Sequence, residues 1–437
     1  MFLPSPVRFC IDTLEAAGFA AYAVGGCVRD ALLGLQPQDY DLCTAATPAQ
    51  TAAVFSNFPL VRAGEKHGTI GVVLEGQVYE ITTFRTEGDY TDSRHPGWVS
   101  FVPEVEQDLA RRDFTVNAMA YSPTRGFADP FCGREDLQNH VLRAVREPSL
   151  RFTEDALRIL RGVRFAVKYD LQPEEKTLDA MVALSPRLEN IASERIFDEL
   201  CKLLPLVKAE ELLQFAPILC QVIPELGPTL GFDQKNAHHA YDIFTHIAHV
   251  TEAVPPQLPL RWAALLHDVG KPATFTLDEQ GQGHFYGHAE KSAEMADTIL
   301  RRLKAPNSLR QQVTQLVSLH MTLIHPEKKV VRRWLGRLGK ETMEQLLTLQ
   351  EADMGSKGTG KPAELAQFAE IRRLMAEIQA ENACLSLKDL AVNGRDLMAL
   401  GYNGKDIGVA LQSLLEAVLD VHLPNEKDAL LKTVRKP

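Results

Sequence analysis

The sequence GGCVRDALLGLQPQDYDL, residues 25–42, combines two adjacent glycines, a short helix signal and two closely spaced aspartates. An apolar run before it predicts a strand over 20–24, and apolar spacing followed by a glycine predicts a helix over 28–33. Gly25 and Gly26 let the backbone approach a phosphate group, and the N-terminus of the following helix favours anions. The stretch therefore indicates a phosphate-binding turn between a strand and a short helix.

The two aspartates, Asp39 and Asp41, fall on a strand predicted over 40–42. Side chains two residues apart on a strand point the same way, with their Cα atoms about 7 Å apart. Two carboxylates that face one spot repel each other unless a divalent cation lies between them, and Mg²⁺ suits a triphosphate. The pair predicts Mg²⁺-dependent nucleotidyl transfer. Glu80, in a hairpin predicted over 69–84, is either a third catalytic carboxylate or an exposed strand residue.

The chain has 437 residues and a formal net charge of −10, with 45% hydrophobic and 24% charged residues, which excludes global disorder. The charge-free run over 42–61 contains polar residues and two prolines, so it predicts no membrane span. The N-terminus lacks the basic start and apolar core of a signal peptide. Seven scattered cysteines without a CxxC pair favour a reducing compartment. We therefore expect a cytoplasmic protein that does not contact membranes.

GGCVRDALLG followed by DYDLCTAATP resembles the opening motif of the class II tRNA nucleotidyltransferases, which are the CCA-adding enzymes, and of the bacterial poly(A) polymerases. The similarity extends from about residue 18 to residue 205. It implies a polymerase-β-like head, Mg²⁺ at the aspartates, and addition of C, C and A to the 3′ end of tRNA from CTP and ATP without a nucleic-acid template. It also implies nucleotide contacts by Gly25, Gly26 and Arg29. A poly(A) polymerase remains the alternative.

In the segment DLARRDFTVNAMAY, residues 108–121, we expect a helix that begins at Arg111, Arg112 and Asp113 and also carries Asn117. Asp113 and Asn117 are four residues apart and so share one helix face. An arginine can contact phosphate and an aspartate can accept from ribose hydroxyls, although a helix-capping network would use the same residues. The resemblance implies that Arg112, Asp113 and Asn117 bind the incoming nucleotide and select ribose.

The segment RFTEDALRILRGVRFA, residues 151–166, predicts one helix with Thr153 as its N-cap. Its acidic and basic residues could form ordinary salt bridges within the helix. One carboxylate and one guanidinium could instead match the edges of cytosine and adenine, whereas uracil and guanine would place a carbonyl against the carboxylate. The resemblance implies that base selection and further nucleotide binding fall on Asp155, Arg158, Arg161 and Arg164.

A polar loop over 85–96 is retained in this sequence. The CCA-adding members of the family have a flexible loop here, and members that add only CC lack much of it. The resemblance therefore favours addition of all three nucleotides.

Four histidines and two aspartates mark the helical second half of the chain. Neutral imidazole and carboxylate groups are ligands for divalent transition metals. The pattern resembles the HD phosphohydrolase superfamily, with Ala289 where a glutamate usually follows the histidine. It predicts a second metal site, and an HD phosphohydrolase as the main activity remains an alternative. The predicted ligands are His246, His267, Asp268, His288, His320 and Asp353.

These features predict an α+β protein, with a small mixed α/β nucleotidyltransferase head followed by all-α parts. The head spans 1–140, the base-recognition neck 141–205, the body with the HD region 206–355, and the tail 356–437. The segment 301–340 holds ten Lys or Arg and one Glu, a net charge of +9. It is either a tRNA-binding surface or a set of solvated helix faces, and we expect no DNA partner.

Overall fold

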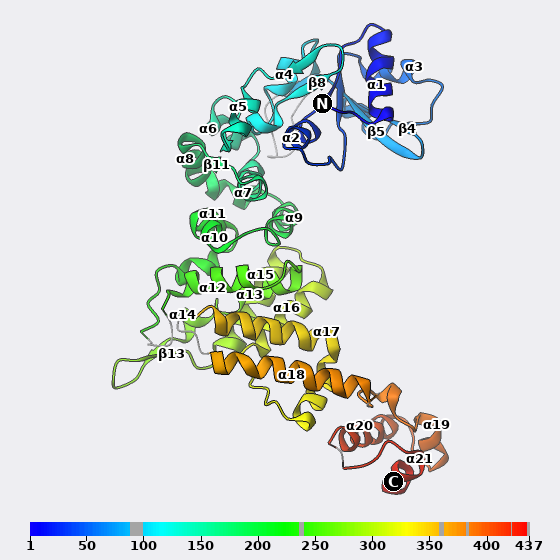
Figure 1. The fold of residues 1–437 in the computed structure, drawn as a ribbon, viewed down its shortest axis with the longest axis vertical. Helices are drawn as coiled ribbons and strands as arrows, with labels where there is room; N and C mark the ends of the chain where they lie inside the picture. The colour runs from blue at the N-terminus through cyan, green and yellow to red at the C-terminus, as the bar shows by residue number, and fades with distance from the viewer. Residues whose placement is uncertain (88–98, 236–239, 358–361, 382–383, 421, 435–437) are drawn as a thin grey trace. The chain divides into compact units, whose positions relative to one another are not determined.

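The computed structural model describes residues 1–87, 99–235, 240–357, 362–381, 384–420 and 422–434 (Figure 1). Its contacts divide the chain into two compact units. One unit comprises residues 1–207 and 214–224, and the other comprises 208–213 and 225–437. The first unit joins the predicted head and neck, and the second joins the predicted body and tail. The finer four-part division remains a prediction.

The first unit contains a seven-stranded sheet, and its fold confirms the predicted mixed α/β head. The strand order is β3–β4–β5–β2–β1–β8–β9. Every neighbouring pair is antiparallel except the parallel pair β2 and β5. The strands are β1 (Ala21–Val24), β2 (Leu42–Thr44), β3 (Leu60–Val61), β4 (Thr69–Leu74), β5 (Gln77–Thr83), β8 (Ala120–Ser122) and β9 (Gly126–Ala128).

Local sequence signals explain several of these elements. Thr47 caps the following helix and forms a reciprocal capping box with Gln50, while Pro48 takes the first helical position. The turn between β4 and β5 has Glu75 at φ 52° and Gly76 at φ 81°. Two positive φ values are typical of the tight hairpin turns that match strand twist. The cap and the proline thus account for the start of α3, and the hairpin predicted over 69–84 is confirmed.

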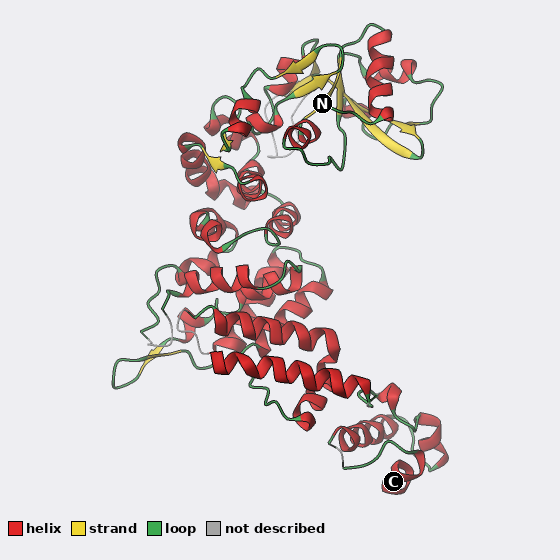
Figure 2. Cartoon of the chain, viewed as in Figure 1, coloured by secondary structure: helices red, strands yellow, loops and turns green. Residues whose placement is uncertain are grey.

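Short helices surround this sheet and continue into the neck, and a two-stranded ribbon and a parallel strand pair accompany them (Figure 2). The helices are α1 (Ser5–Ala16), α2 (Gly26–Leu32), α3 (Pro48–Val54), α4 (Val105–Leu109), α5 (Gly133–Gln138), α6 (Pro148–Glu154), α7 (Leu157–Tyr169), α8 (Glu175–Leu184), α9 (Ser193–Leu203) and α11 (Ala216–Val222). The minor strands are β6 (Arg85–Glu87), β7 (Val99–Phe101), β10 (Val141–Leu142) and β11 (Gln172–Pro173).

Three local predictions are wrong. β2 begins at Leu42, so the two aspartates precede the strand rather than lie on it. The helix expected to begin at Arg111 is absent, because α4 ends at Leu109 and only a 3₁₀ turn over Thr115–Asn117 follows. Thr153 is not an N-cap, because it lies inside α6, and the backbone extends at Asp155 before α7 begins. In each case a turn that positions site residues interrupts the regular element.

The second unit is helical apart from one hairpin of two-residue strands, β12 (Thr276–Leu277) and β13 (Gly283–His284). Together with the first unit, it confirms the α+β class. No helix in the described part of this chain is both long enough and apolar enough to cross a bilayer. The helices are α10 (Ala209–Gln214), α12 (Ile243–Ala253), α13 (Leu258–Leu266), α14 (Lys271–Thr274), α15 (His288–Arg302), α16 (Asn307–Leu319), α17 (Lys328–Gly355), α18 (Pro362–Ala380), α19 (Gly394–Ala399), α20 (Lys405–Leu419) and α21 (Lys427–Thr433).

Candidate functional site

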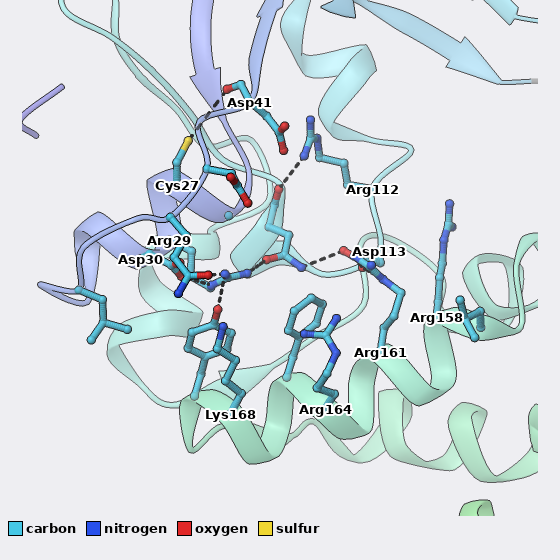
Figure 3. Close-up of a pocket in the computed structure, with 18 of the residues that line it drawn as sticks. Cys27, Arg29, Asp30, Asp41, Arg112, Asp113, Arg158, Arg161, Arg164 and Lys168 are labelled. Atoms are coloured by element: carbon cyan, nitrogen blue, oxygen red, sulfur yellow. Dashed lines mark hydrogen bonds and ion pairs between the residues drawn. The ribbon is translucent and has the colours of Figure 1, made fainter. Parts of the chain in front are cut away.

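A cleft of about 760 Å³ in the first unit collects most of the residues that the sequence assigned to nucleotide chemistry (Figure 3). Its walls come from the turn before β2, helix α2, the turn after α4, and helix α7. Basic side chains outnumber acidic ones in the lining, as a polyanionic ligand requires. The charged lining residues are Arg29, Asp30, Asp39, Asp41, Arg111, Arg112, Asp113, Asp155, Arg158, Arg161, Arg164, Lys168 and Arg195.

Asp39 and Asp41 line the cleft directly before β2. The Asp41 carbonyl accepts a hydrogen bond from the Val24 amide at 2.9 Å, which fixes this turn to β1. Burial raises the pKa of Asp41; the Arg112 guanidinium opposes this rise and the neighbouring Asp39 carboxylate adds to it. A divalent cation would relieve the repulsion between the two carboxylates. The donor set therefore fits a hard cation that prefers oxygen ligands.

Glu80 lies on β5, which runs parallel to β2 with Leu42 opposite Ile81. By this register Glu80 is level with Asp41, which lies directly before β2. Glu80 is exposed and is not among the residues that line the cleft. Its catalytic role remains a prediction.

Of the two adjacent glycines, only Gly25 occupies a position that a larger residue could not take. Gly25 has φ 78°, and a Cβ atom there would lie 2.6 Å from Nη1 of Arg112. A Cβ on Gly26 would meet its nearest neighbour, Nη2 of Arg29, at an ordinary 3.5 Å. Gly26 lines the cleft at the start of α2, whereas Gly25 keeps the space in which Arg112 lies.

Arg29 is 5% exposed, and its partners hold it in place in the cleft floor. Its guanidinium donates to Asp30 at 2.7 Å and also to the Asn117 side chain, and it lies 4.0 Å from the centre of the Tyr169 ring. These contacts join α2, the 3₁₀ turn and the end of α7.

Asp113 and Asn117 touch even though the expected helix is absent. Asn117 Nδ2 donates to Asp113 Oδ1 at 3.0 Å, and Arg161 Nη2 lies 2.7 Å from Asp113 Oδ2. Burial alone would raise the pKa of Asp113, but the Arg161 charge and the Asn117 hydrogen bond outweigh it and hold that pKa well below its usual range. Asp113 is therefore a fixed carboxylate in the cleft wall.

This ion pair predicts a pH-dependent stability difference. Because the folded-state pKa of Asp113 is lowered, its stabilisation is complete above the unfolded-state pKa of about 3.9 and is lost as the pH falls further. At about pH 7, Asp113→Asn should lower the free energy of unfolding by about 1–3 kcal/mol. The difference in the free energy of unfolding between the variant and the unsubstituted protein should become smaller below about pH 4. Thermal unfolding of both proteins measures this difference. A difference in unfolding free energy that stays constant down to about pH 3 would contradict this account.

Asp155 and Arg158 both line the cleft but do not pair with each other through their side chains. Asp155 Oδ2 accepts from Arg195 at 2.9 Å, and its Oδ1 accepts from the Leu157 amide at 3.0 Å. Arg158 donates to Glu154 Oε2 at 2.8 Å, as the helix spacing predicts. The carboxylate and the guanidinium are thus held separately.

Arg158 keeps hydrogen-bonding capacity for a ligand. The residue is 8% exposed, and its guanidinium makes three hydrogen bonds, to the Arg151 carbonyl, to Glu154 and to the Arg111 carbonyl. A guanidinium has five N–H groups. Donors therefore remain beside the Asp155 carboxylate in the cleft.

Helix α7 presents a basic stripe to the cleft. Arg158, Arg161, Arg164 and Lys168 recur at spacings of three and four residues, so they share one face, as Figure 3 shows. Arg164 pairs with Glu199 of α9 at 2.6 Å, and both side chains are largely buried. Helix α9 therefore stabilises the cleft by holding a side chain of α7 in place.

The Glu199 pair predicts a large loss of stability on truncation. Glu199→Ala leaves the Arg164 charge buried without its partner, which should lower the free energy of unfolding by about 3–5 kcal/mol. Glu194→Ala on the same helix removes an exposed carboxylate and should change it by less than about 0.5 kcal/mol. Calorimetric unfolding of the two variants measures the difference. Equal unfolding profiles would refute the supporting role of this pair.

Sequence reasoning missed several residues of the cleft, among them Lys168, Tyr169 and Arg195. Lys168 and Tyr169 end α7, and Arg195 lies on α9. The helical spacing from Arg158 could have identified Lys168. Nothing in the sequence pairs Arg195 with Asp155, because forty residues separate them.

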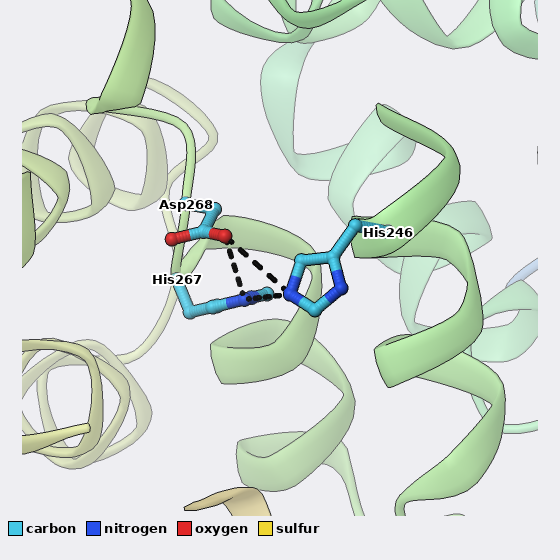
Figure 4. A group of neighbouring side chains, drawn as sticks. All are labelled: His246, His267 and Asp268. Atoms are coloured by element: carbon cyan, nitrogen blue, oxygen red, sulfur yellow. Dashed lines mark hydrogen bonds and ion pairs between the residues drawn. The ribbon is translucent and has the colours of Figure 1, made fainter. Parts of the chain in front are cut away.

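The predicted metal ligands of the second unit come together in one buried cluster. His246 Nε2 lies 2.9 Å from Asp353 Oδ1. Figure 4 shows His246 beside His267, whose Nε2 lies 3.4 Å from His246 Nε2. His267 Nε2 lies 3.2 Å from Asp268 Oδ2. Two groups in this cluster could each hold a metal ion, namely His246 with His267 and Asp268, and Asp268 with His288 and His320.

The basic segment 301–340 is largely paired with acidic residues. Six of its ten basic side chains form ion pairs, for example Arg302 with Glu225 and Arg333 with Asp420. Among the described residues, no acidic partner within 4.0 Å is found for Lys304, Lys329, Arg337 or Lys340. The basic surface is therefore smaller than the sequence indicates.

The retained loop lies largely outside the described residues, which omit 88–98. Its ends form the antiparallel pair β6 and β7, with Arg85 opposite Phe101.

Three family models match this chain in succession. Residues 21–143 match the Poly A polymerase head domain, residues 170–226 match a probable RNA and SrmB-binding site of polymerase A, and residues 275–434 match a putative domain 2 of tRNA nucleotidyltransferase. Together with the sheet and the charged cleft, these matches define a nucleotidyltransferase of the poly(A) polymerase class.

Full-length relatives identify the family. The CCA-adding enzyme of Streptococcus thermophilus is 34% identical, covering 99% of this chain and 98% of its own length. That of Enterococcus faecalis is also 34% identical, covering 98% of this chain and 94% of its own length. The crystal structure of the Bacillus stearothermophilus CCA-adding enzyme in complex with CTP has a TM-score of 0.72 at 28% identity, covering 99% of this chain and 98% of that one. The chain belongs to the CCA-adding enzyme family, which confirms the resemblance, and the alternatives are not favoured.

Proposed function

We propose that this protein adds C, C and A to the 3′ end of tRNA, using CTP and ATP and no nucleic-acid template. The observation that carries the proposal is the cleft that combines Asp39 and Asp41 with Asp155 and Arg158. Asp39 and Asp41 suit metal-dependent nucleotidyl transfer, and Asp155 with Arg158 suits selection of the base. The Bacillus stearothermophilus relative was crystallised with CTP, which supports CTP as a substrate here.

We propose that Asp39 and Asp41 hold Mg²⁺, with Glu80 as a third carboxylate. When bound, the ion would polarise the α-phosphate and lower the pKa of the attacking hydroxyl. The tRNA 3′-hydroxyl attacks the α-phosphorus of the nucleotide, a new phosphodiester bond forms, and pyrophosphate leaves. Arg112, together with Arg161 and Arg164 of α7, binds the triphosphate, since guanidinium groups pair well with phosphate oxygens.

Asp113, Asn117 and Arg29 form the wall against which the ribose lies. The Arg161 contact keeps Asp113 ionised, and a ribose hydroxyl would share carboxylate oxygens that already accept from Arg161, Asn117 and a backbone amide. Arg29 keeps Asn117 in position by donating to its side-chain oxygen. Gly25 and Gly26 leave room for Arg112 and for the nucleotide.

Asp155 and Arg158 take the place of a template base. The carboxylate accepts from the exocyclic amino group of cytosine or adenine, and the guanidinium donates to the adjacent ring nitrogen. Uracil and guanine place a carbonyl oxygen against the carboxylate, so two acceptors face each other. A buried acceptor left without a donor costs about 1–3 kcal/mol. Two such mismatches explain rejection of UTP and GTP.

In the second unit, we propose that the histidine cluster binds a divalent transition metal and that the unpaired lysines of 301–340 contact the tRNA body. Seven free cysteines fit action in the reducing cytoplasm. The proposed steps of nucleotide addition all lie in the first unit and do not involve the histidine cluster. Asp268→Ala should therefore leave CMP incorporation within about twofold of the unsubstituted enzyme, provided that the variant folds.

Metal-dependent release of pyrophosphate tests the transferase proposal. Incubation with CTP, Mg²⁺ and a tRNA transcript ending at the discriminator base should release two pyrophosphates per tRNA, and omission of the tRNA or the metal should abolish release. A hydrolytic enzyme would instead release phosphate without tRNA. Either that result or no release at all would overturn the proposal.

A further inference from the structure

Lys168 ends the row of basic side chains that α7 presents to the cleft. Figure 3 shows Lys168 at one end of this row and Arg158 at the other. Because a helix rises about 1.5 Å per residue, the ten positions between them place their backbones about 15 Å apart along α7. The base and the far end of a triphosphate can therefore contact opposite ends of the same helix.

Each of the three arginines in this row is paired with a carboxylate of the protein. The pairs are Arg158 with Glu154 at 2.8 Å, Arg161 with Asp113 at 2.7 Å, and Arg164 with Glu199 at 2.6 Å. Opposite charges in contact cancel much of each other's field at a distance. These arginines alone therefore attract a polyanion less strongly than their number indicates.

Lys168 differs from these arginines because its charge is not compensated. Within the described ranges of the chain, its ammonium group has no hydrogen-bond acceptor and no carboxylate within 4.0 Å. Its Nζ lies 5.0 Å from the centre of the adjacent Tyr169 ring, a contact that favours a cation. Asp30, which also lines the cleft, pairs with Arg29 at 2.7 Å instead. Lys168 thus adds a net positive charge to its end of the cleft.

The row also passes from buried to exposed along α7. Arg158 is 8% exposed, whereas Lys168 is exposed. Selection of a base requires a buried contact, where water cannot replace a lost hydrogen bond. A leaving pyrophosphate requires access to solvent. The Lys168 end of the cleft therefore suits the end of the triphosphate that is farthest from the base.

We propose that Lys168 binds the terminal phosphate of the incoming CTP or ATP. That phosphate carries more negative charge than either inner phosphate, so it gains most from an ammonium group that has no carboxylate partner in the described structure. This inference rests on the proposed nucleotide addition. It adds the residue by which the enzyme distinguishes a triphosphate from a diphosphate.

The contact acts on nucleotide affinity rather than on the chemical step. The bond that breaks joins the α-phosphorus to the oxygen that it shares with the β-phosphate, and the new charge appears on that oxygen. The terminal phosphate carries nearly the same charge before and during this step. A residue that binds it equally well in the ground state and in the transition state lowers KM and leaves kcat unchanged.

The test compares Lys168→Gln with the unsubstituted enzyme in CMP addition to a tRNA transcript that ends at the discriminator base. The CTP concentration at half-maximal rate should rise about tenfold, and the maximal single-turnover rate should stay within about threefold. The inhibition constant of CDP, which lacks the terminal phosphate, should change by less than about twofold. Lys168→Arg should restore most of the CTP affinity.

Lys176→Gln is the matched control. Lys176 is an exposed lysine of α8 that does not line the cleft, so its loss removes the same charge from the first unit without touching the nucleotide. The CTP concentration at half-maximal rate should be unchanged in this variant. A rise equal to that of Lys168→Gln would reduce the effect to general electrostatics and overturn the proposal.

The remaining outcomes separate the proposal from its competitors. An unchanged CTP affinity in Lys168→Gln would overturn it, as would a loss of tRNA affinity alone, which would indicate a primer contact. Equal losses of CTP and CDP binding would exclude the terminal phosphate as the partner. Unchanged CDP inhibition also shows that the variant is folded. No CMP addition by the unsubstituted enzyme would overturn the proposed function itself, so the two failures are distinguishable.

Discussion

Asp41→Asn should reduce CMP incorporation into tRNA by about a thousandfold or more. The substitution preserves shape but removes one of the two carboxylates that we propose hold the metal in the cleft. Stabilisation of the reacting phosphate by a bound metal is worth several kcal/mol, and each 1.36 kcal/mol is a factor of ten in rate. The measurement is the single-turnover rate with a tRNA transcript that lacks CCA, under saturating CTP and Mg²⁺.

Two further variants make this result specific. Asp12→Asn removes an exposed carboxylate from α1 and should leave the rate unchanged. Glu80→Gln should reduce the rate by a smaller factor, because Glu80 is level with Asp41 on the neighbouring strand but does not line the cleft. A wild-type rate for Asp41→Asn would remove the assignment of the metal site. A wild-type rate for Glu80→Gln would remove only the third carboxylate.

Asp155→Ala should weaken the choice of base. The enzyme discriminates CTP from UTP through a carboxylate that accepts from the cytosine amino group. Loss of one buried mismatch of about 1–3 kcal/mol corresponds to a roughly 5–150-fold drop in the ratio of kcat/KM values for CTP and UTP. Competition between the two labelled nucleotides on a tRNA ending at the discriminator base measures that ratio.

Arg195→Ala is the matched control for Asp155→Ala. It removes the partner of Asp155 Oδ2 but leaves the carboxylate in the cleft. If Asp155 serves only to anchor α9, the two variants should behave alike. We expect Arg195→Ala to lower the rate and to retain the preference for CTP. An unchanged ratio in Asp155→Ala would contradict its role as a template group.

The sequence predicted the composition of the site better than its local geometry. The glycine pair, the two aspartates and the Asp155–Arg158 motif are contiguous signals, and the structure brings Gly26, the aspartates and that motif to one cleft. The elements that carry them were assigned less well, because functional turns interrupt regular spacing. Asp155 has extended backbone angles between two helices, where helical periodicity predicts a continuous helix.

Long-range ion pairs explain most of what the sequence could not show. The Arg164–Glu199 and Asp155–Arg195 pairs join segments that lie 35 and 40 residues apart. The charge of 301–340 was overestimated for the same reason, since Glu225, Asp297, Glu381 and Asp420 neutralise much of it from outside that segment. Charge spacing along a chain does not reveal such partners.

The most direct test of the central claim is stepwise incorporation. Each of the four labelled nucleotides is offered, with Mg²⁺, to tRNA transcripts ending at the discriminator base, at C and at CC. We predict CMP on the first two transcripts, AMP on the third, arrest after the A, and no incorporation from UTP or GTP. Long A tracts on any RNA end, or arrest after CC with ATP present, would contradict the proposed addition of CCA.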